Sequence, residues 1–206
     1  MLGTSWLQSE EFIVFSTRNL ALTLNKSVSS TSRFLRLCEK KGLIEKVTRG
    51  IWANTKHPYF TPTAVVPTLL GSSQGYVSFL TALHRKGIIS QIPNSIQIAT
   101  TGSPRLLRSK IGTFEFFQIK PEMMQQGIDW SETRCPYRIA SSEKALLDIL
   151  YLSTRKGRRF ISLPEIEFPR TFKRKRFLQL INQQIKDPRI KAAVMQKVKK
   201  GFRPFR

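Results

Sequence analysis

Acidic residues are scarce in this sequence of 206 residues. Thirteen Asp and Glu stand against 35 Lys and Arg, which gives a formal net charge of +22. A nuclease that holds two metal ions needs clustered carboxylates, and so few acidic residues argue against one. A chain this basic repels itself unless it works with a polyanion, and nucleic acid is the commonest such partner. We therefore expect a nucleic-acid partner rather than a membrane surface.

Cysteine and long apolar segments are also scarce. Cys38 and Cys135 lie far apart without a Cys or His at metal-ligand spacing, so two free thiols in a reducing compartment are expected. No apolar run approaches the roughly 18 residues needed to span a bilayer. The opening MLGTSWLQSEEF lacks the basic and apolar regions of a signal peptide. These absences predict a cytoplasmic protein.

Familiar catalytic motifs are missing as well. His57 and His84 have no carboxylate or Cys at ligand spacing, and no glycine-rich phosphate-binding loop occurs. Gly71-Ser72 has the start of a nucleotidyltransferase motif, but no Asp-x-Asp follows it. Glu143 and Asp148 are five apart and so point to different faces of a helix, which favours structural roles. We expect no enzyme activity, no cofactor and no metal.

The chain nevertheless has the composition of a folded protein. Hydrophobic residues make up 40 % of it, and Phe alone contributes 14. The first sixty residues predict a helix over 4–14, a second helix capped by Ser16 or Thr17 and running to about Leu24, and a third from about Val28 to Lys41. Gly42 is expected to end the third helix.

The third helix has the composition of a DNA-reading helix. Phe34, Leu37 and Cys38 are expected to pack against the second helix, while hydroxyls and arginines crowd the start of the third. Ser and Thr bind phosphates or base edges, and Arg can hold guanine with two hydrogen bonds. The predicted DNA-binding residues here are Lys26, Ser27, Ser29, Ser30, Thr31, Arg33 and Arg36.

A hairpin is expected directly after this helix. Residues 43–48 alternate in character, and Arg49-Gly50 forms the predicted turn before Ile51-Trp52-Ala53. A hairpin that follows a recognition helix is a wing, and Arg49 at its tip can contact a minor groove or its phosphates. The alternative is a small α/β unit whose hydroxyls are merely exposed.

The rest of the chain predicts a sheet covered by helices. Strands are expected at 95–100 and 113–119, and Tyr76, Phe79, Leu80 and Leu83 are assigned to one buried helix face. Ala145, Leu146, Ile149, Leu150 and Leu152 are assigned to a second. Two amphipathic helices are expected at about 172–186 and 188–200, with Asp187-Pro188 starting the latter.

The last quarter of the chain carries most of the positive charge. Residues 155–206 hold seventeen basic and three acidic residues, a net charge of +14. This part of the chain predicts additional phosphate contacts. They are assigned to Arg155, Lys156, Arg158, Arg159, Lys173, Arg174, Lys175 and Arg176.

The predicted fold class is therefore α+β. An N-terminal winged helix-turn-helix is expected over residues 1–57, and an α/β C-terminal domain ending in basic amphipathic helices over residues 58–206.

Three segments, in order, resemble one family. FLRLCEKKGLIEKVTRGIWAN is similar to the winged helix of the AbiEi antitoxins of type IV toxin–antitoxin, or abortive-infection, systems. GYVSFLTALHRKGIISQIPNSIQIATTG, residues 75–102, resembles the family's next helix, loop and first strand. YRIASSEKALLDILYLS, residues 137–153, resembles the strand and helix that close the same domain.

The resemblance implies a two-domain repressor that binds inverted repeats of double-stranded DNA in its own promoter. It also implies a C-terminal domain that counteracts a cognate nucleotidyltransferase toxin without a stable complex. Within the winged helix, the resemblance assigns DNA contacts to Ser29, Ser30, Thr31, Arg33, Arg36 and Arg49. The strongly basic C-terminal part departs from the family.

Two other functions remain open at the level of sequence. The basic helices could hold folded RNA by its shape, in an RNA-binding or ribosome-associated module without an antitoxin role. Alternatively, the basic C-terminal part could bind an acidic partner protein, which predicts co-purification with the toxin.

Overall fold

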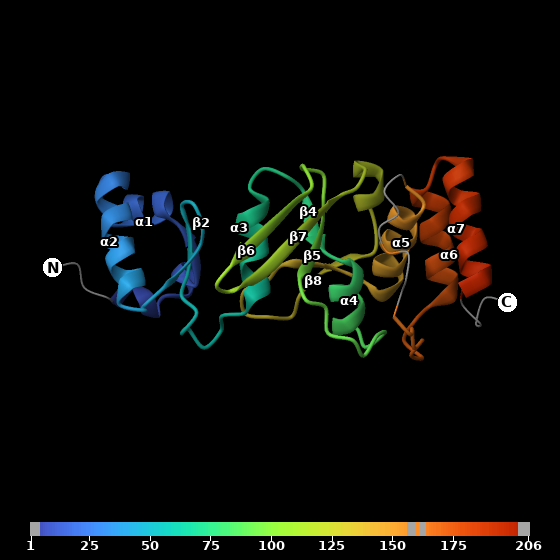
Figure 1. Ribbon diagram of the computed structural model, residues 1–206, viewed down its shortest axis with the longest axis horizontal. Helices are drawn as coiled ribbons and strands as arrows, with labels where there is room; N and C mark the ends of the chain where they lie inside the picture. The colour runs from blue at the N-terminus through green and yellow to red at the C-terminus, as the bar shows by residue number, and fades with distance from the viewer. Residues whose placement is uncertain (1–4, 156–159, 161–163, 202–206) are drawn as a thin grey trace.

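The computed structural model describes residues 5–155, 160 and 164–201. These residues form seven α-helices and two β-sheets, as expected for the α+β class. The molecule is elongated, with α1 (Thr17–Thr23) and α2 (Val28–Lys40) at one end and a six-stranded sheet in the middle (Figure 1). Helices α6 (Arg174–Gln184) and α7 (Pro188–Gly201) lie at the other end. None of the described helices is both long enough and apolar enough to cross a bilayer.

The N-terminal end combines two helices with a small sheet. Two 3-10 turns, Ser5–Gln8 and Glu10–Phe12, precede all of these elements. The elements are β1 (Val14–Ser16), α1 (Thr17–Thr23), α2 (Val28–Lys40), β2 (Glu45–Thr48) and β3 (Ile51–Ala53). The strands are antiparallel in the order β1-β3-β2. The predicted second helix, third helix and hairpin are confirmed.

The helix predicted over residues 4–14 is wrong. Ser9 accepts a hydrogen bond from the Glu11 N–H and starts a separate 3-10 turn. Val14 then pairs with Ala53 in the sheet, which extended backbone allows and helical backbone does not. Pairing with a hairpin some forty residues later therefore decided the conformation of this segment.

An aromatic cluster forms the core of the N-terminal end. The ring of Trp6 meets those of Phe12 and Phe15 edge to face, with centroids 5.7 and 5.4 Å apart. Such pairs contribute about 0.5–1.5 kcal/mol beyond the burial of their area. The buried members of this cluster are Trp6, Phe12, Phe15, Leu20, Leu35, Cys38, Ile44 and Trp52.

A mixed six-stranded sheet forms the middle of the molecule. Its order is β6-β7-β5-β4-β9-β8, with β5–β7 and β4–β9 parallel and the other pairs antiparallel. The strands are β4 (Gly75–Val77), β5 (Ile96–Thr100), β6 (Arg105–Ser109), β7 (Gly112–Gln118), β8 (Ile128–Trp130) and β9 (Arg138–Ala140). The strands predicted at 95–100 and 113–119 are confirmed as β5 and β7.

Helix α5 (Ser142–Ser153) is the centre of the second core. All of its residues from Glu143 to Ser153 are buried, so it has no solvent-facing side. It packs against α4, α6, α7 and β9. The remaining helical elements before it are the 3-10 turns Pro62–Val65 and Pro121–Met124, α3 (Val66–Leu70) and α4 (Phe79–Arg85).

One assignment within this core is corrected. Tyr76, predicted on a helix face with Phe79, lies on β4 instead, because Gly75–Val77 pairs with both β5 and β9. Its ring is still fully buried. The predicted burial of Tyr76 is therefore confirmed, and its predicted helical conformation is wrong.

The two C-terminal helices agree with the prediction. They are α6 (Arg174–Gln184) and α7 (Pro188–Gly201). The Asp187 carboxylate accepts hydrogen bonds from the Arg189 and Ile190 N–H groups at 2.8 and 3.4 Å, so it caps α7. Phe177 and Ile181 on α6 and Val194 on α7 have no more than 1 % of their surface exposed.

Two ion pairs join the N-terminal end to the rest of the molecule. Lys110 Nζ lies 3.3 Å from a Glu45 carboxylate oxygen, and Arg134 Nε lies 3.0 Å from one of Glu10. The buried apolar residues form two clusters, and Val47 and Ala53 of the hairpin belong to the larger one. The domain boundary at residues 57 and 58 stays a prediction.

Candidate nucleic-acid interface

Helix α2 is fixed at both ends by its own sequence. The Ser27 hydroxyl accepts a hydrogen bond from the Ser30 N–H at 3.1 Å and caps the start. Gly42 has φ +65°, a left-handed conformation that glycine adopts without strain and that stops the helix. The helix therefore has one register, and each of its side chains has a definite direction.

The buried side of α2 is narrow. Thr31, Leu35 and Cys38 are at most 3 % exposed and face the aromatic cluster. Burial raises the pKa of the Cys38 thiol, although nearby Lys41 opposes this effect. The structure corrects the predicted packing face here: Leu35 takes the central place, and Leu37 is 57 % exposed.

Thr31 is also a correction to the predicted interface. Only 1 % of its surface is exposed, so its hydroxyl cannot reach a DNA groove. Thr31 lies four residues before Leu35 and therefore on the same side of the helix. The prediction took a run of polar residues as one surface, but successive side chains of a helix point about 100° apart, so a run of five cannot all face the same side.

A basic stripe occupies the opposite side of α2. Ser29, Arg33, Arg36 and Lys40 are all exposed and follow one another at intervals of four, three and four residues. That spacing places them on one face of a helix. Lys40 was not among the predicted DNA-binding residues. Its position eleven residues, or about three helical turns, after Ser29 could have indicated that it lies on the same face.

The other predicted residues near the start of α2 are accessible to different degrees. Lys26 and Ser27 are exposed, and Ser30 is half-buried. The Ser27 oxygen already accepts the capping hydrogen bond, so its hydroxyl hydrogen is left to donate. Lys26 and Ser27 are therefore accessible at the N-terminal end of α2.

The hairpin presents a further arginine. Arg49 is exposed at the turn, and Gly50 beside it has φ +77°. The Gly50 carbonyl accepts a hydrogen bond from the Thr17 N–H at 2.8 Å, which ties the turn to the start of α1. The Trp52 indole N–H donates to the Thr17 hydroxyl at 2.8 Å. The turn is therefore held against the helix pair.

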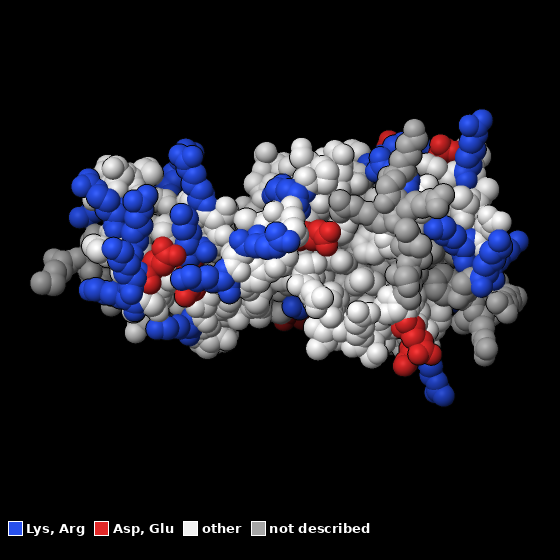
Figure 2. Space-filling model, viewed as in Figure 1, with Lys and Arg blue, Asp and Glu red and all other residues white. Residues whose placement is uncertain are grey.

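Positive charge gathers at this end of the molecule. Figure 2 shows Lys and Arg side chains crowded over the end formed by α1, α2 and the hairpin, with few acidic side chains among them. Arg18 of α1 and Lys46 of β2 are exposed there and were also missed. Edge strand β6 adds exposed Arg105 and Arg108 next to β2.

The predicted C-terminal contacts lie elsewhere. Lys173, Arg174, Lys175 and Arg176 are exposed at the start of α6. Helix α6 and helix α2 lie at opposite ends of the molecule (Figure 1). The structure therefore does not combine the two basic regions into one continuous site. Lys156, Arg158 and Arg159 lie outside the described residues.

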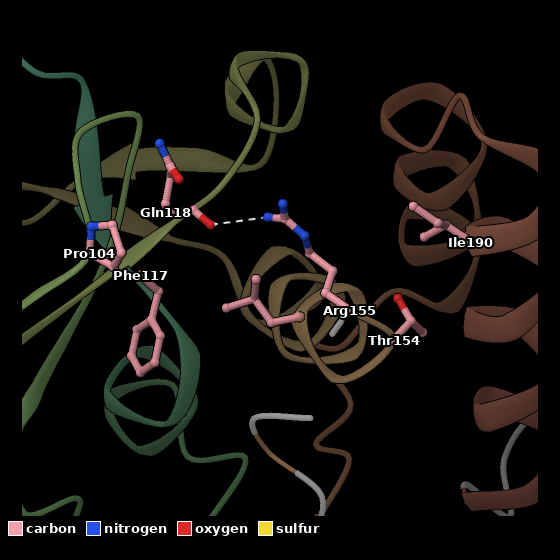
Figure 3. A pocket seen from close by; sticks show the side chains of 7 residues that line it. Pro104, Phe117, Gln118, Thr154, Arg155 and Ile190 are labelled. Atoms are coloured by element: carbon pink, nitrogen blue, oxygen red, sulfur yellow. Dashed lines mark hydrogen bonds between the residues drawn. The ribbon is translucent and has the colours of Figure 1, made fainter. Parts of the chain in front are cut away.

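Arg155 belongs to a pocket rather than to either basic region. Its guanidinium donates to the Gln118 carbonyl at 3.5 Å (Figure 3). The same group lies 5.7 Å from the centre of the Tyr151 ring. The pocket has a volume of about 440 Å³. It is lined by Pro104, Phe117, Gln118, Leu152, Thr154, Arg155 and Ile190.

A buried polar network joins β4 to α5 and could be mistaken for a catalytic centre. Lys144 Nζ pairs with one oxygen of the Asp148 carboxylate, and both side chains are fully buried. The second oxygen accepts hydrogen bonds from the Tyr76 and Ser78 hydroxyls at 3.0 and 2.7 Å. Burial lowers the pKa of Lys144 and raises that of Asp148.

Glu143, the other acid of this helix, has separate partners. Its carboxylate accepts a hydrogen bond from the Lys173 N–H at 2.8 Å and thereby holds the start of α6. Glu143 and Asp148 therefore act on different neighbours, as their five-residue separation suggested. Neither carboxylate lines a described pocket.

Comparison of the sequence with models of known protein families and with curated proteins found no match to either.

Proposed function

We propose that this protein is a DNA-binding repressor whose α1–α2 pair and β2–β3 hairpin act as a winged helix-turn-helix. The observation that carries the proposal is the stripe of Ser29, Arg33, Arg36 and Lys40 on the side of α2 opposite its packed face. A helix in the major groove needs such a face, with hydroxyls and guanidiniums that reach phosphates and base edges.

The hairpin supplies the second part of the interface. Arg49 is exposed at its turn, and the turn is bonded to the start of α1. A wing arginine held in this way contacts the minor groove or the phosphates beside the helix. Arg105 and Arg108 on β6 increase the positive potential next to the wing and favour fast association with a polyanion.

The biological role is proposed from the resemblance of residues 34–54, 75–102 and 137–153 to AbiEi antitoxins. The repressor would bind inverted repeats in its own promoter and counteract a nucleotidyltransferase toxin without a stable complex. No cofactor and no enzyme activity belong to this proposal. In this proposal the buried network around Lys144 and Asp148 has a structural role, because its members are bonded to one another inside the core.

The test compares DNA with RNA as the partner. The full chain is titrated against labelled duplex from the region upstream of its reading frame, against scrambled duplex and against structured RNA at physiological salt. Specific proteins bind their sites about 10³–10⁷ times more tightly than other DNA. Equal affinity for the two duplexes would contradict the repressor proposal and indicate a protein that binds polyanions in general. Tighter binding to the RNA would indicate an RNA-binding module.

The antitoxin role is tested separately. The chain is co-expressed with the product of the adjacent reading frame, and growth is compared with expression of that product alone. Rescue of growth supports the role, whereas continued growth arrest by an active toxin contradicts it. Co-purification of the two chains would instead support direct binding of the partner protein.

A further inference from the structure

The more basic end of the molecule is the one that the proposed function leaves unused. Residues 172–201, which include α6 and α7, hold ten basic residues and one acidic residue, a net charge of +9. Residues 1–60, which include α2 and the hairpin, have a net charge of only +5. Helices α6 and α2 lie at opposite ends of the molecule (Figure 1). A short duplex bound to α2 therefore leaves the greater positive charge without a polyanion.

Helix α6 repeats the arrangement of α2, with a polar stripe opposite a packed face. Lys175, Gln179 and Asn182 are exposed at intervals of four and three residues, the same intervals that align the stripe of α2. The buried residues of α6 are Phe177, Leu180, Ile181 and Gln184. The exposed residues are all basic or carry a side-chain amide, namely Arg174, Lys175, Arg176, Gln179, Asn182 and Gln183. The exposed face of α6 thus has no acidic side chain.

Helix α7 adds positive charge at the same end of the molecule. Arg189 and Lys199 are exposed near its two ends, and the helix contains no acidic residue. The one acidic residue of 172–201 is Asp187, and its carboxylate already accepts the N–H groups of Arg189 and Ile190. Figure 2 shows Lys and Arg side chains at this end of the molecule as well. The segment therefore presents its positive charge with little compensation from its own carboxylate.

The side chains of α6 fit duplex DNA better than a single strand or RNA. Single strands are held by stacking on exposed aromatic rings, but Phe177, the one aromatic residue of α6 and α7, is fully buried. The major groove of A-form RNA is too deep and narrow for side chains to read, whereas that of B-DNA admits an α-helix. Lys175 suits a phosphate, and the amides of Gln179 and Asn182 suit phosphates or base edges.

We propose that the exposed face of α6, together with the basic residues of α7, is a second site for duplex DNA. It holds one DNA segment while α2 holds another, so a single chain bridges two segments. A short duplex on α2 leaves the second site open to another duplex, because the two helices lie at opposite ends. A long duplex offers both segments in one molecule, which raises the effective concentration of the second. The inference rests on the proposed function only in naming α2 as the first site.

Capture of a second duplex tests the bridge in the full chain. A duplex of about 15 base pairs from the specific site is fixed to beads and loaded with protein, and a labelled duplex of unrelated sequence and equal length is added. We expect saturable retention of the label on beads that carry protein and none on bare DNA beads. Absence of retention while the protein stays on the beads would overturn the proposal. Preferential retention of structured RNA would overturn the assignment to DNA.

Matched variants locate the second site. Lys175→Ala and Lys86→Ala each remove one exposed lysine, but Lys86 lies at the end of α4, outside both basic regions. Lys175→Ala should lower the log–log salt slope of second-duplex capture by about 0.9, because one phosphate contact is lost. Lys86→Ala should leave that slope unchanged, and both variants should stay on the specific duplex like the parent chain. Equal capture by the two variants would contradict a site on α6.

A chain with a disabled α2 separates this proposal from the reading role of α2. Arg33→Ala with Arg36→Ala removes two arginines of the basic stripe, so duplex binding then depends mainly on α6 and α7. Adding Lys175→Ala to this chain should lower the remaining affinity about fivefold at physiological salt, the effect of one phosphate contact. An unchanged affinity would overturn the second site. A loss of affinity in a protein whose parent chain does not distinguish specific from scrambled duplex would support the second site and contradict the repressor.

Discussion

Thr31 and Arg33 lie two residues apart on α2 and face opposite sides of it. The Thr31 side chain is buried against the aromatic core, whereas Arg33 is exposed on the basic stripe. One helix therefore carries a packing face and a candidate reading face within a single turn. Substitutions on the two faces should therefore have different effects on DNA binding and on stability.

Arg33 and Arg36 should each be needed for sequence-specific binding. Replacing either with Ala should cost about 1–3 kcal/mol on the specific duplex if the arginine holds a base, and much less on scrambled DNA. Fluorescence anisotropy with the two duplexes measures the difference. Equal losses of affinity on the two duplexes would show that the arginines contact phosphates only, and that α2 does not read the base sequence.

Thr31 should contribute nothing to DNA binding. Its hydroxyl is buried without a partner among the described residues, so Thr31→Val should leave stability unchanged or raise it by roughly 1 kcal/mol. Urea unfolding measures the stability and anisotropy the binding. Ser29→Ala is the matched control, because it removes an exposed hydroxyl from the stripe and should weaken binding. A loss of affinity in Thr31→Val without destabilisation would contradict the arrangement described here.

The two basic ends should respond differently to the length of the DNA. Lys40→Ala should lower the salt dependence of binding by about 0.9 in the log–log slope on any duplex, if Lys40 contacts one phosphate. The double variant Lys175→Ala, Arg176→Ala should change affinity only on a long duplex, because α6 lies at the opposite end from α2. Duplexes of roughly 15 and 40 base pairs, about one and a half and four helical turns, make the comparison. A loss on the short duplex would place both ends on one site.

The buried ion pair should show strong coupling. Asp148→Asn leaves the Lys144 ammonium buried without its counter-charge and should cost about 3–5 kcal/mol. Adding Lys144→Met removes that charge, so the double variant should be much more stable than the sum of the single losses predicts. A double-mutant cycle by urea unfolding gives the coupling. Additive losses would mean that the two charges do not stabilise each other.

Tyr76 should make the fold sensitive to alkali. Burial and the neighbouring Asp148 raise its pKa well above the ordinary value near 10. The unfolded chain loses this proton above about pH 10 while the folded chain keeps it, so stability must fall as pH rises beyond that point. Tyr76→Phe should flatten this fall, measured by urea unfolding between pH 8 and about pH 11. An unchanged pH dependence would show that Tyr76 ionises freely in the folded protein.

Local sequence signals predicted the elements that they control directly. Ser27 and Gly42 delimit α2, Asp187 caps α7, and alternating apolar residues mark β5 and β7. Each of these signals acts over a few residues, so neighbours in the sequence contain the whole cause. Helical spacing also aligns the stripe from Ser29 to Lys40, although Lys40 was not among the predicted DNA-binding residues.

Longer-range contacts decided where prediction failed. Val14 is extended because β3 pairs with it, and Tyr76 lies on a strand because β5 and β9 flank it. Leu37 is exposed because Leu35 and Cys38 already meet the aromatic cluster. The sequence contains the residues involved, but not the information about which of them meet.

The sequence by itself determined the charge of this protein, the ends of its main helices and the spacing of the basic stripe. These follow from composition and from hydrogen bonds that span three or four residues. Only the tertiary structure decided that Thr31 is buried and that the two basic regions lie at opposite ends. Packing brings together residues tens of positions apart, and no local pattern encodes which of them will meet.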